Sequence, residues 1–341
     1  MLMKRNKWIL YIDGALLAVF TACSADAPME MTQDDDRVEI RVNSSIVSSV
    51  EPATRAVVEG MINSTFGTDL DVAFVRADAD DASGNYTGYK TSALAGTVNT
   101  SKTLAFSPAE YYLANGNKTK LIGWYPRRDG VTFASDTRVV SFGAIDGKTD
   151  IMVTPLKEGN KTTAISDLAF SHLLTQISVK VYAPDEATQK LWGTVNSIAI
   201  AGKKQTCTVT LPEATSTDGT TVGSLAFTGT DDLDLVKVNP TASPSTAISY
   251  PLTIGIADNA DAATVTTAGY AMFAPQATGK IELKIALSAG GNQTAQVAVP
   301  TGGFKAGTSY AITLKFTSAG VTPTVSVTDW ATGDAIKDIT I

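Results

Sequence analysis

Short runs of alternating apolar and polar residues, each bounded by turn-forming residues, recur along almost the whole chain of 341 residues. The runs are rich in Val, Ile, Thr, Tyr and Phe, which strands favour, and clusters of Gly, Asn, Asp, Ser and Pro separate them. The one expected helix is short and covers residues 186–192. This spacing predicts an all-β protein built from β-sandwiches. The clearest expected strands cover residues 38–42, 70–75, 103–106, 120–125, 150–154, 176–182, 197–201, 206–211, 281–287, 294–299, 310–316 and 324–329.

The N-terminus has the pattern of an export signal. Basic residues within the first seven positions precede an apolar run at 8–20, which is shorter than the roughly 20 residues of a membrane-spanning helix. The last residue of this run begins the sequence Phe-Thr-Ala-Cys, which resembles the lipobox of bacterial lipoproteins. We therefore expect residues 1–23 to be a lipoprotein signal peptide with lipid on Cys23. The alternative is an ordinary signal peptide with a cysteine there by chance.

The next segment combines a tether and a strand. Residues 24–36 are polar and acidic, which predicts a flexible connection. An alternating strand follows at 37–43, with Val38, Ile40 and Val42 on one face and charged residues on the other. Since such an apolar face needs an apolar partner, we expect this strand to pack against a sheet.

Residues 48–56 hold small residues, one proline and a single arginine, Arg55. A trypsin-like protease can cut after an arginine in an exposed, flexible segment. The same residues are also typical of a simple loop between strands, and on local sequence alone the loop is the safer interpretation.

The charge balance argues against nucleic acid as a partner. The chain holds 27 Lys and Arg against 34 Asp and Glu, a net charge of −7. The part before Ala56 has six basic and eight acidic residues, so the remainder has 21 against 26, or −5. Binding to phosphates needs a basic surface, which this composition does not provide.

The candidate residues for catalysis or metal binding have simpler structural interpretations. His172 is the only histidine, which excludes a multi-histidine metal site, and we expect it to be structural, on a strand near a domain junction. Cys207 lies in an alternating strand and is expected to be a small core residue. Phosphate-binding glycine loops and a nucleophile elbow are absent, so we predict no catalytic residue, metal or cofactor. Two acidic groups lack calcium-loop spacing and are expected in solvated loops: Asp78, Asp80 and Asp81, and Asp231, Asp232 and Asp234.

Several aromatic residues offer a different possibility. Tyr111, Tyr112, Trp124 and Tyr125 form a candidate platform for sugars. In alternating strands, however, about half of such residues face the core. We expect Trp330 to pack in the core or at a junction.

The order of several short motifs resembles the fimbrillin family, the type V pilins of Gram-negative anaerobes. The resemblance implies two tandem transthyretin-like β-sandwich domains and a cut by an arginine-specific protease between Arg55 and Ala56. The motifs are the lipobox Cys23, the strand followed by Thr-Arg-Ala at 54–56, and residues 120–126, 149–153, 170–177, 307–310 and 327–330.

With this resemblance, the expected organisation is a signal peptide at 1–23 and a propeptide at 24–55, followed by two domains. A stretch at 155–166 with Gly, Asn, Lys and Thr precedes a strand region near residue 168. We therefore divide the mature protein into an N-terminal domain at 56–167 and a C-terminal domain at 168–341.

The resemblance also implies an assembly mechanism. Cleavage would remove the lipid anchor together with Val38, Ile40 and Val42, and a strand of another subunit would fill the groove they leave. The candidate donor is the C-terminal segment at 335–341, although Lys337 shares a face with two of its isoleucines. Val325 and Val327 are further candidates. The donor residues are Ile336, Ile339 and Ile341.

The sequence thus predicts a structural protein rather than an enzyme. We expect a fimbrial subunit, exported as a lipoprotein to the outer membrane and cell surface and polymerised with other pilin subunits. The alternative is a surface-anchored β-sandwich lipoprotein that binds a glycan or host ligand and is never cut.

Overall fold

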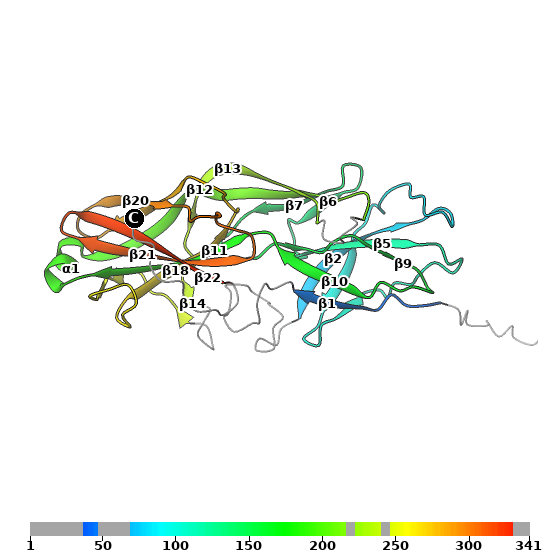
Figure 1. Cartoon of the computed structure of the whole chain (residues 1–341), viewed down its shortest axis with the longest axis horizontal. Coiled ribbons are helices and arrows are strands. Elements are labelled where there is room, and N and C mark those ends of the chain that lie inside the picture. Colours follow the sequence, from blue (N-terminus) through cyan, green and yellow to red (C-terminus); the bar gives the residue numbers. More distant parts are fainter. Residues whose placement is uncertain (1–36, 47–68, 216–221, 240–245, 330–341) are drawn as a thin grey trace, which may run out of the picture. The chain divides into compact units, whose positions relative to one another are not determined.

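The computed structural model describes residues 37–46, 69–215, 222–239 and 246–329, and within them the fold is nearly all β (Figure 1). The prediction of an all-β protein is confirmed. The short helix α1 (Glu186–Trp192) lies where the sequence predicts it. Asp185 caps the helix by accepting a hydrogen bond of 2.7 Å from the Thr188 N–H, and Gly193 ends it with a positive φ of 69°. None of the helices in the described part is long and apolar enough to cross a bilayer.

The first sheet forms a closed ring of strands. In order around the sheet, its strands are β2 (Leu70–Asp78), β3 (Leu94–Val98), β4 (Thr103–Phe106), β1 (Val42–Ile46), β10 (Asp167–His172), β8 (Met152–Val153), β5 (Thr119–Tyr125) and β9 (Lys157–Gly159). The ring closes because β2 also pairs with β5. Closure leaves no free edge between β4 and β10, where β1 lies.

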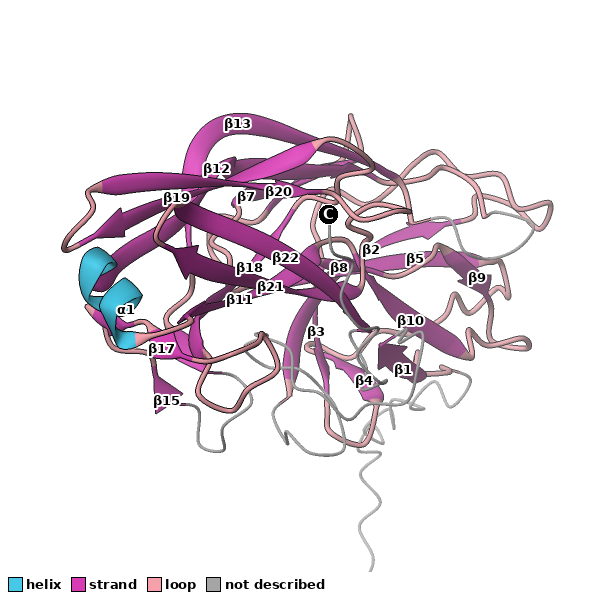
Figure 2. Cartoon of the chain, turned by 60° about the vertical axis from the view of Figure 1, so that its left-hand side comes forward, coloured by secondary structure: helices cyan, strands magenta, loops and turns pink. Residues whose placement is uncertain are grey.

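Two further sheets and a two-stranded ribbon contain the remaining strands of the described chain (Figure 2). One contains β17 (Gly255–Ile256), β11 (Thr175–Ala183), β21 (Thr308–Thr317), β22 (Gly320–Asp329) and β18 (Thr266–Phe273). The other contains β20 (Asn292–Ala298), β19 (Lys280–Leu287), β12 (Thr194–Thr210), β7 (Val139–Ala144), β6 (Thr132–Ala134), β13 (Ser224–Asp234) and β16 (Leu252–Thr253). A two-stranded ribbon contains β14 (Val238–Asn239) and β15 (Thr246–Ala247).

Two hydrophobic clusters hold these sheets together. The larger one contains buried residues of both later sheets, among them Val179 from β11, Ile312 from β21, Ile200 from β12 and Leu283 from β19. Side chains from two facing sheets in one cluster are the packing that defines a β-sandwich. The smaller cluster fills the first sheet and includes Ile40, Val42, Phe74, Leu104 and Phe170.

Some strands differ from those expected. The expected strands at 197–201 and 206–211 are one strand, β12, because register shifts and the positive φ of Gly202 bend the chain without ending the ladder. The expected strand at 150–154 is reduced to Met152–Val153. The first strand begins later than expected, because the chain before Val42 pairs only through an isolated bridge between Glu39 and Tyr111.

The expected division at 167/168 falls inside β10, which pairs with β1 and β8 in the first sheet. In addition, β7 lies before the division in sequence but pairs with β12 after it. All described residues lie in one compact unit that begins at Arg37. The division into domains at 56–167 and 168–341 stays a prediction.

Candidate functional site

The strand β1 occupies an interior position that the ring of the first sheet needs for closure. It runs antiparallel to β4, with Val42 opposite Leu104, and parallel to β10, with Ser44 opposite Leu168; the three strands are labelled in Figure 2. The space that residues 40–46 (β1 and the two residues before it) fill between β10 on one side and β4 with residues 110–112 on the other is called the β1 slot below. The 22 residues that follow β1 lie outside the described part. The contacts given below are therefore those that β1 makes within the slot.

The side chains of this segment alternate between core and solvent. Ile40 is 1% exposed and Val42 is 2% exposed, whereas Arg41 and Asn43 between and after them are exposed. Val38 is 39% exposed, so it contributes little to the core, contrary to expectation. The reason is that Val38 lies beyond the regular ladder, at the rim of the sheet.

Backbone hydrogen bonds hold the segment at both of its ends. The Ile40 N–H donates to the Glu110 carbonyl at 2.7 Å, and the Tyr112 N–H donates to the Val38 carbonyl at 2.9 Å. Further along, the Ser44 N–H donates to the Lys102 carbonyl at 2.8 Å. Removal of the strand would leave these groups without their partners, which is the condition that favours the addition of another strand.

A nearly buried ion cluster holds the segment at 110–112 that receives residues 38–40. Arg76, whose side chain is 5% exposed, pairs with Asp78 at 2.7 Å and with Glu110 at 2.8 Å. Burial favours a higher pKa for Asp78, but hydrogen bonds from Lys90, Arg76 and Thr119 outweigh it and hold the pKa below its ordinary value. These contacts fix one wall of the β1 slot independently of β1.

Most of the sequence-predicted site residues lie outside the described residues. These are the lipidation site Cys23, the processing residues Arg55 and Ala56, the donor residues Ile336, Ile339 and Ile341, and Trp330. The last described strand is β22, which pairs along its length with β21. Val325 on β22 is half-buried and lines a groove of about 340 Å³ between β20 and β22.

His172 is buried at the end of β10 and pairs with the fully buried Asp150 carboxylate. Cys207 is also buried, and burial raises the pKa of its thiol to about 12. At that pKa the thiolate is scarce at neutral pH, so the thiol is a poor nucleophile. In the described ranges, no three His, Cys, Asp or Glu residues gather closely enough to hold a metal ion.

Three of the four aromatic residues of the possible sugar platform are buried, in line with the alternative that such residues face the core. Trp124 is 2%, Tyr112 is 4% and Tyr125 is 7% exposed, because these side chains face the core from the first sheet. Tyr111 is half-buried, and the Arg37 guanidinium lies 4.1 Å from the centre of its ring. These four residues therefore do not form an exposed binding face.

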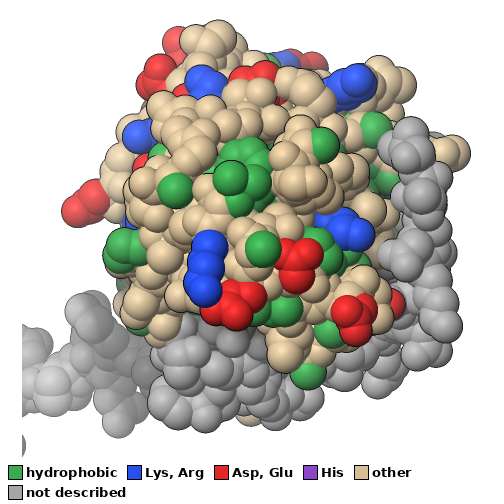
Figure 3. Space-filling model, turned by 90° about the vertical axis from the view of Figure 1, so that its left-hand side faces the viewer, with side chains coloured by type: hydrophobic (Ala, Val, Ile, Leu, Met, Phe, Trp, Pro, Cys, Tyr) green, Lys and Arg blue, Asp and Glu red, His purple; other side chains and the backbone are tan. Residues whose placement is uncertain are grey.

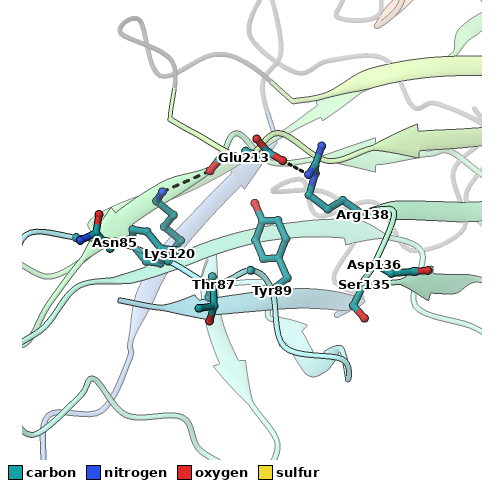
Figure 4. Close-up of a pocket in the computed structure, with 12 residues that line it drawn as sticks. Asn85, Thr87, Tyr89, Lys120, Ser135, Asp136, Arg138 and Glu213 are labelled. Carbon is teal, nitrogen blue, oxygen red and sulfur yellow. Dashed lines mark hydrogen bonds and ion pairs between the residues drawn. The ribbon is translucent and has the colours of Figure 1, made fainter. Parts of the chain in front are cut away.

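A polar pocket of about 640 Å³ lies elsewhere, between the loop at 84–89, Lys120 on β5, the segment at 135–138 and Glu213 (Figure 4). Three of its charged residues are linked to one another: Arg138 pairs with the Glu213 carboxylate, and Lys120 donates to the Glu213 carbonyl at 3.4 Å. The Tyr89 hydroxyl donates to the Pro212 carbonyl at 2.7 Å. Since these polar groups have hydrogen-bond or ion-pair partners within the protein, we interpret the pocket as a structural contact between strands and not as a binding site.

The face that carries α1 also offers no large apolar surface. Figure 3 shows its hydrophobic side chains as small separate patches among acidic and basic ones. The most exposed large apolar residues in the described ranges are Val38, Leu191, Leu225 and Ile256. The β1 slot is thus the feature that combines apolar pockets with backbone groups that need a strand.

Comparisons with known proteins agree with this architecture. A model of the fimbrillin-like family matches residues 54–330. The chain belongs to the fimbrillin-like family. Membership makes it a fimbrial or adhesion-type subunit of a surface structure. The match begins at Thr54, directly before the expected cut and after β1.

Solved structures show the same fold in proteins of distant sequence. A protein from Bacteroides uniformis proposed to act in cell adhesion is 17% identical, with a TM-score of 0.54, over 87% of this chain and 100% of that one. A similar protein from Bacteroides ovatus is 16% identical, with a TM-score of 0.50, over 87% of this chain and 99% of that one. No curated protein sequence matches the chain.

The structure also reveals functional candidates that the sequence did not indicate. Ser44 is 2% exposed, and its hydroxyl donates to the Leu168 carbonyl at 2.8 Å. Arg76 and Glu110 meet although 34 residues separate them in sequence. An arginine inside an apolar strand such as 70–78 is a signal for a buried ion pair, but nothing in the sequence indicates its partner.

Proposed function

We propose that this fimbrillin-like chain is the precursor of a fimbrial subunit that polymerises by donor-strand exchange. In this proposal it is exported, lipidated at Cys23 and carried to the outer membrane. An arginine-specific protease then cuts between Arg55 and Ala56. The cut separates β1 from the body of the protein, and a strand of another pilin subunit takes its place.

The observation that carries the proposal is the position of β1. It lies before the expected cut in sequence, yet it fills an interior place in a closed sheet. Burial of Ile40 and Val42 contributes on the order of 1.5–3 kcal/mol each, and the ladder to β4 and β10 adds hydrogen bonds. A strand that replaces β1 recovers both the side-chain burial and the hydrogen bonds, which supports a stable interface between subunits.

Substitution of Arg55 tests the proposal. The Arg55→Ala protein should be exported and lipidated but should stay monomeric, because β1 remains attached. The matched control is Arg127→Ala, which removes an exposed arginine that pairs with the exposed Asp71 at 3.0 Å. Fibres of normal length from Arg55→Ala, measured by electron microscopy and by assemblies stable in mild denaturant, would contradict the processing step.

A surface-binding lipoprotein that is never cut is the competing function. Three of the four aromatic residues that could have bound a sugar are buried, and Arg138, Lys120 and Glu213 of the polar pocket are linked to one another. No observation on the described residues favours it over assembly.

A further inference from the structure

The β1 slot has four inward positions, and they differ in the side chains they accept. Ile40, Val42 and Ser44 are 1%, 2% and 2% exposed, and Ile46 is half-buried against the same cluster. Arg41 and Asn43 face solvent. An occupant of the slot therefore presents its side chains at alternate positions as large apolar, large apolar, small and large apolar.

The third position is narrow and polar at its base. The Ser44 hydroxyl donates to the Leu168 carbonyl at 2.8 Å, from the β10 side of the slot. The hollow beside Ser44, lined by Leu70, Val98 and Phe170, measures about 10 Å³, which is at the lower limit of the space that one water molecule needs. Lys102 also lines this hollow, so a second positive charge placed there would be repelled.

The C-terminal sequence of this chain does not match that pattern. Read towards the N-terminus, the candidate donor places Ile341 and Ile339 at the first two positions and Lys337 at the third. On the opposite face of the candidate donor segment, Ile336 is accompanied by two polar residues. Between residues 321 and 341, no stretch in either direction has two large apolar residues followed at the next alternate position by Ser, Thr, Ala or Gly.

We infer that the β1 slot selects its occupant at the Ser44 position, and that the strand which fills it comes from a different polypeptide. That strand carries two large apolar residues and then a small residue at alternate positions. The inference rests on the proposed function, since the slot opens only after β1 leaves. It makes this chain a subunit that receives a different pilin rather than another copy of itself.

The test uses the full chain with the site of a sequence-specific protease in place of residues 54–56. After the cut and removal of the released N-terminal fragment, the protein is mixed with fluorescent peptides, and their entry into the slot is followed by fluorescence polarisation. One peptide has the sequence of residues 37–46, and two others carry Ser44→Ala and Ser44→Lys. A fourth has the sequence of residues 330–341 of this chain.

We expect the 37–46 peptide to bind and Ser44→Ala to bind within about tenfold of it, because only one hydrogen bond is lost. The Ser44→Lys peptide and the C-terminal peptide should bind about 100-fold or more weakly, because each buries an unpaired charge. Equal binding of the C-terminal and 37–46 peptides would overturn the inference. If the 37–46 peptide fails to enter, strand exchange itself is wrong, and the inference falls with it.

A second measurement needs no exchange. In the uncut chain, Ser44→Lys should lower the thermal midpoint strongly and Ser44→Ala only slightly. Equal midpoints for the two variants would contradict the narrow third position, whether or not subunits polymerise.

Discussion

At the scale of single residues, the hold on β1 depends mainly on two aliphatic side chains. Ile40→Ala in the uncut chain should lower the free energy of unfolding by about 2–4 kcal/mol, because it leaves a cavity in the smaller hydrophobic cluster. Val38→Ala is the matched control, since Val38 is 39% exposed, and it should change stability by less than about 0.5 kcal/mol. Urea unfolding of both variants measures the difference, and equal effects would show that Ile40 does not anchor the strand.

The carboxylate of Asp78 makes stability depend on pH. Its folded-state pKa lies below the ordinary value of 3.8, so it stabilises the fold above that value, and the stabilisation is lost as the pH falls through the folded-state pKa. The unfolding free energy of the natural chain should therefore drop as the pH falls from about 5 through the folded-state pKa of Asp78, and that of Asp78→Asn should drop less. Asp80→Asn, at an exposed neighbouring position, should keep the natural pH dependence. The same slope in all three proteins would contradict this role of Asp78.

Single-residue interpretations from the sequence succeed where burial follows directly from alternation. Ile40, Val42 and Cys207 are buried, as their strand patterns predict. Val38 is not, because its exposure depends on where the ladder ends, and the sequence has no signal for that end. The environment of Ser44 also depends on Leu168, which is 124 residues away.

At the scale of elements, the wall of the β1 slot is fixed by Arg76. Arg76→Met should destabilise the chain by about 3–5 kcal/mol, because it leaves the partly buried Glu110 without its ion pair and removes one of the partners of Asp78. It should also speed hydrogen exchange at residues 110–112. Arg127→Met breaks an exposed pair with Asp71 and should cost less than about 1 kcal/mol. Unchanged exchange at 110–112 in Arg76→Met would show that the wall is held by other contacts.

The elements themselves are predictable to different degrees. The alternating strands β11 and β19, the mostly apolar strand β5 and the capped helix α1 lie where the sequence predicts them. The strands β3, β6 and β9 are short, and β3 and β9 contain glycine, so their side chains give little periodic signal and they form because neighbours pair with them. The bend in β12 at Gly202 looks like a turn in sequence, but the cross-strand pairing to β13 continues past it.

At the scale of the whole molecule, β1 is the strand that closes a ring and also the segment separated from the body by the expected cut. Cleavage without a replacement strand should therefore open the sheet between β4 and β10. We expect faster hydrogen exchange in β4 and β10 after cleavage and removal of β1, and recovery when a strand binds. The strands β19 and β20 belong to another sheet and should not change, which makes them the internal control.

The most direct test of the account is the N-terminal residue of the protein in assembled fibres, determined by mass spectrometry. The account predicts Ala56, because β1 must leave before another strand can enter its slot. A lipidated Cys23 at the N-terminus of subunits within the fibre would contradict it, since β1 would then still be attached to every subunit.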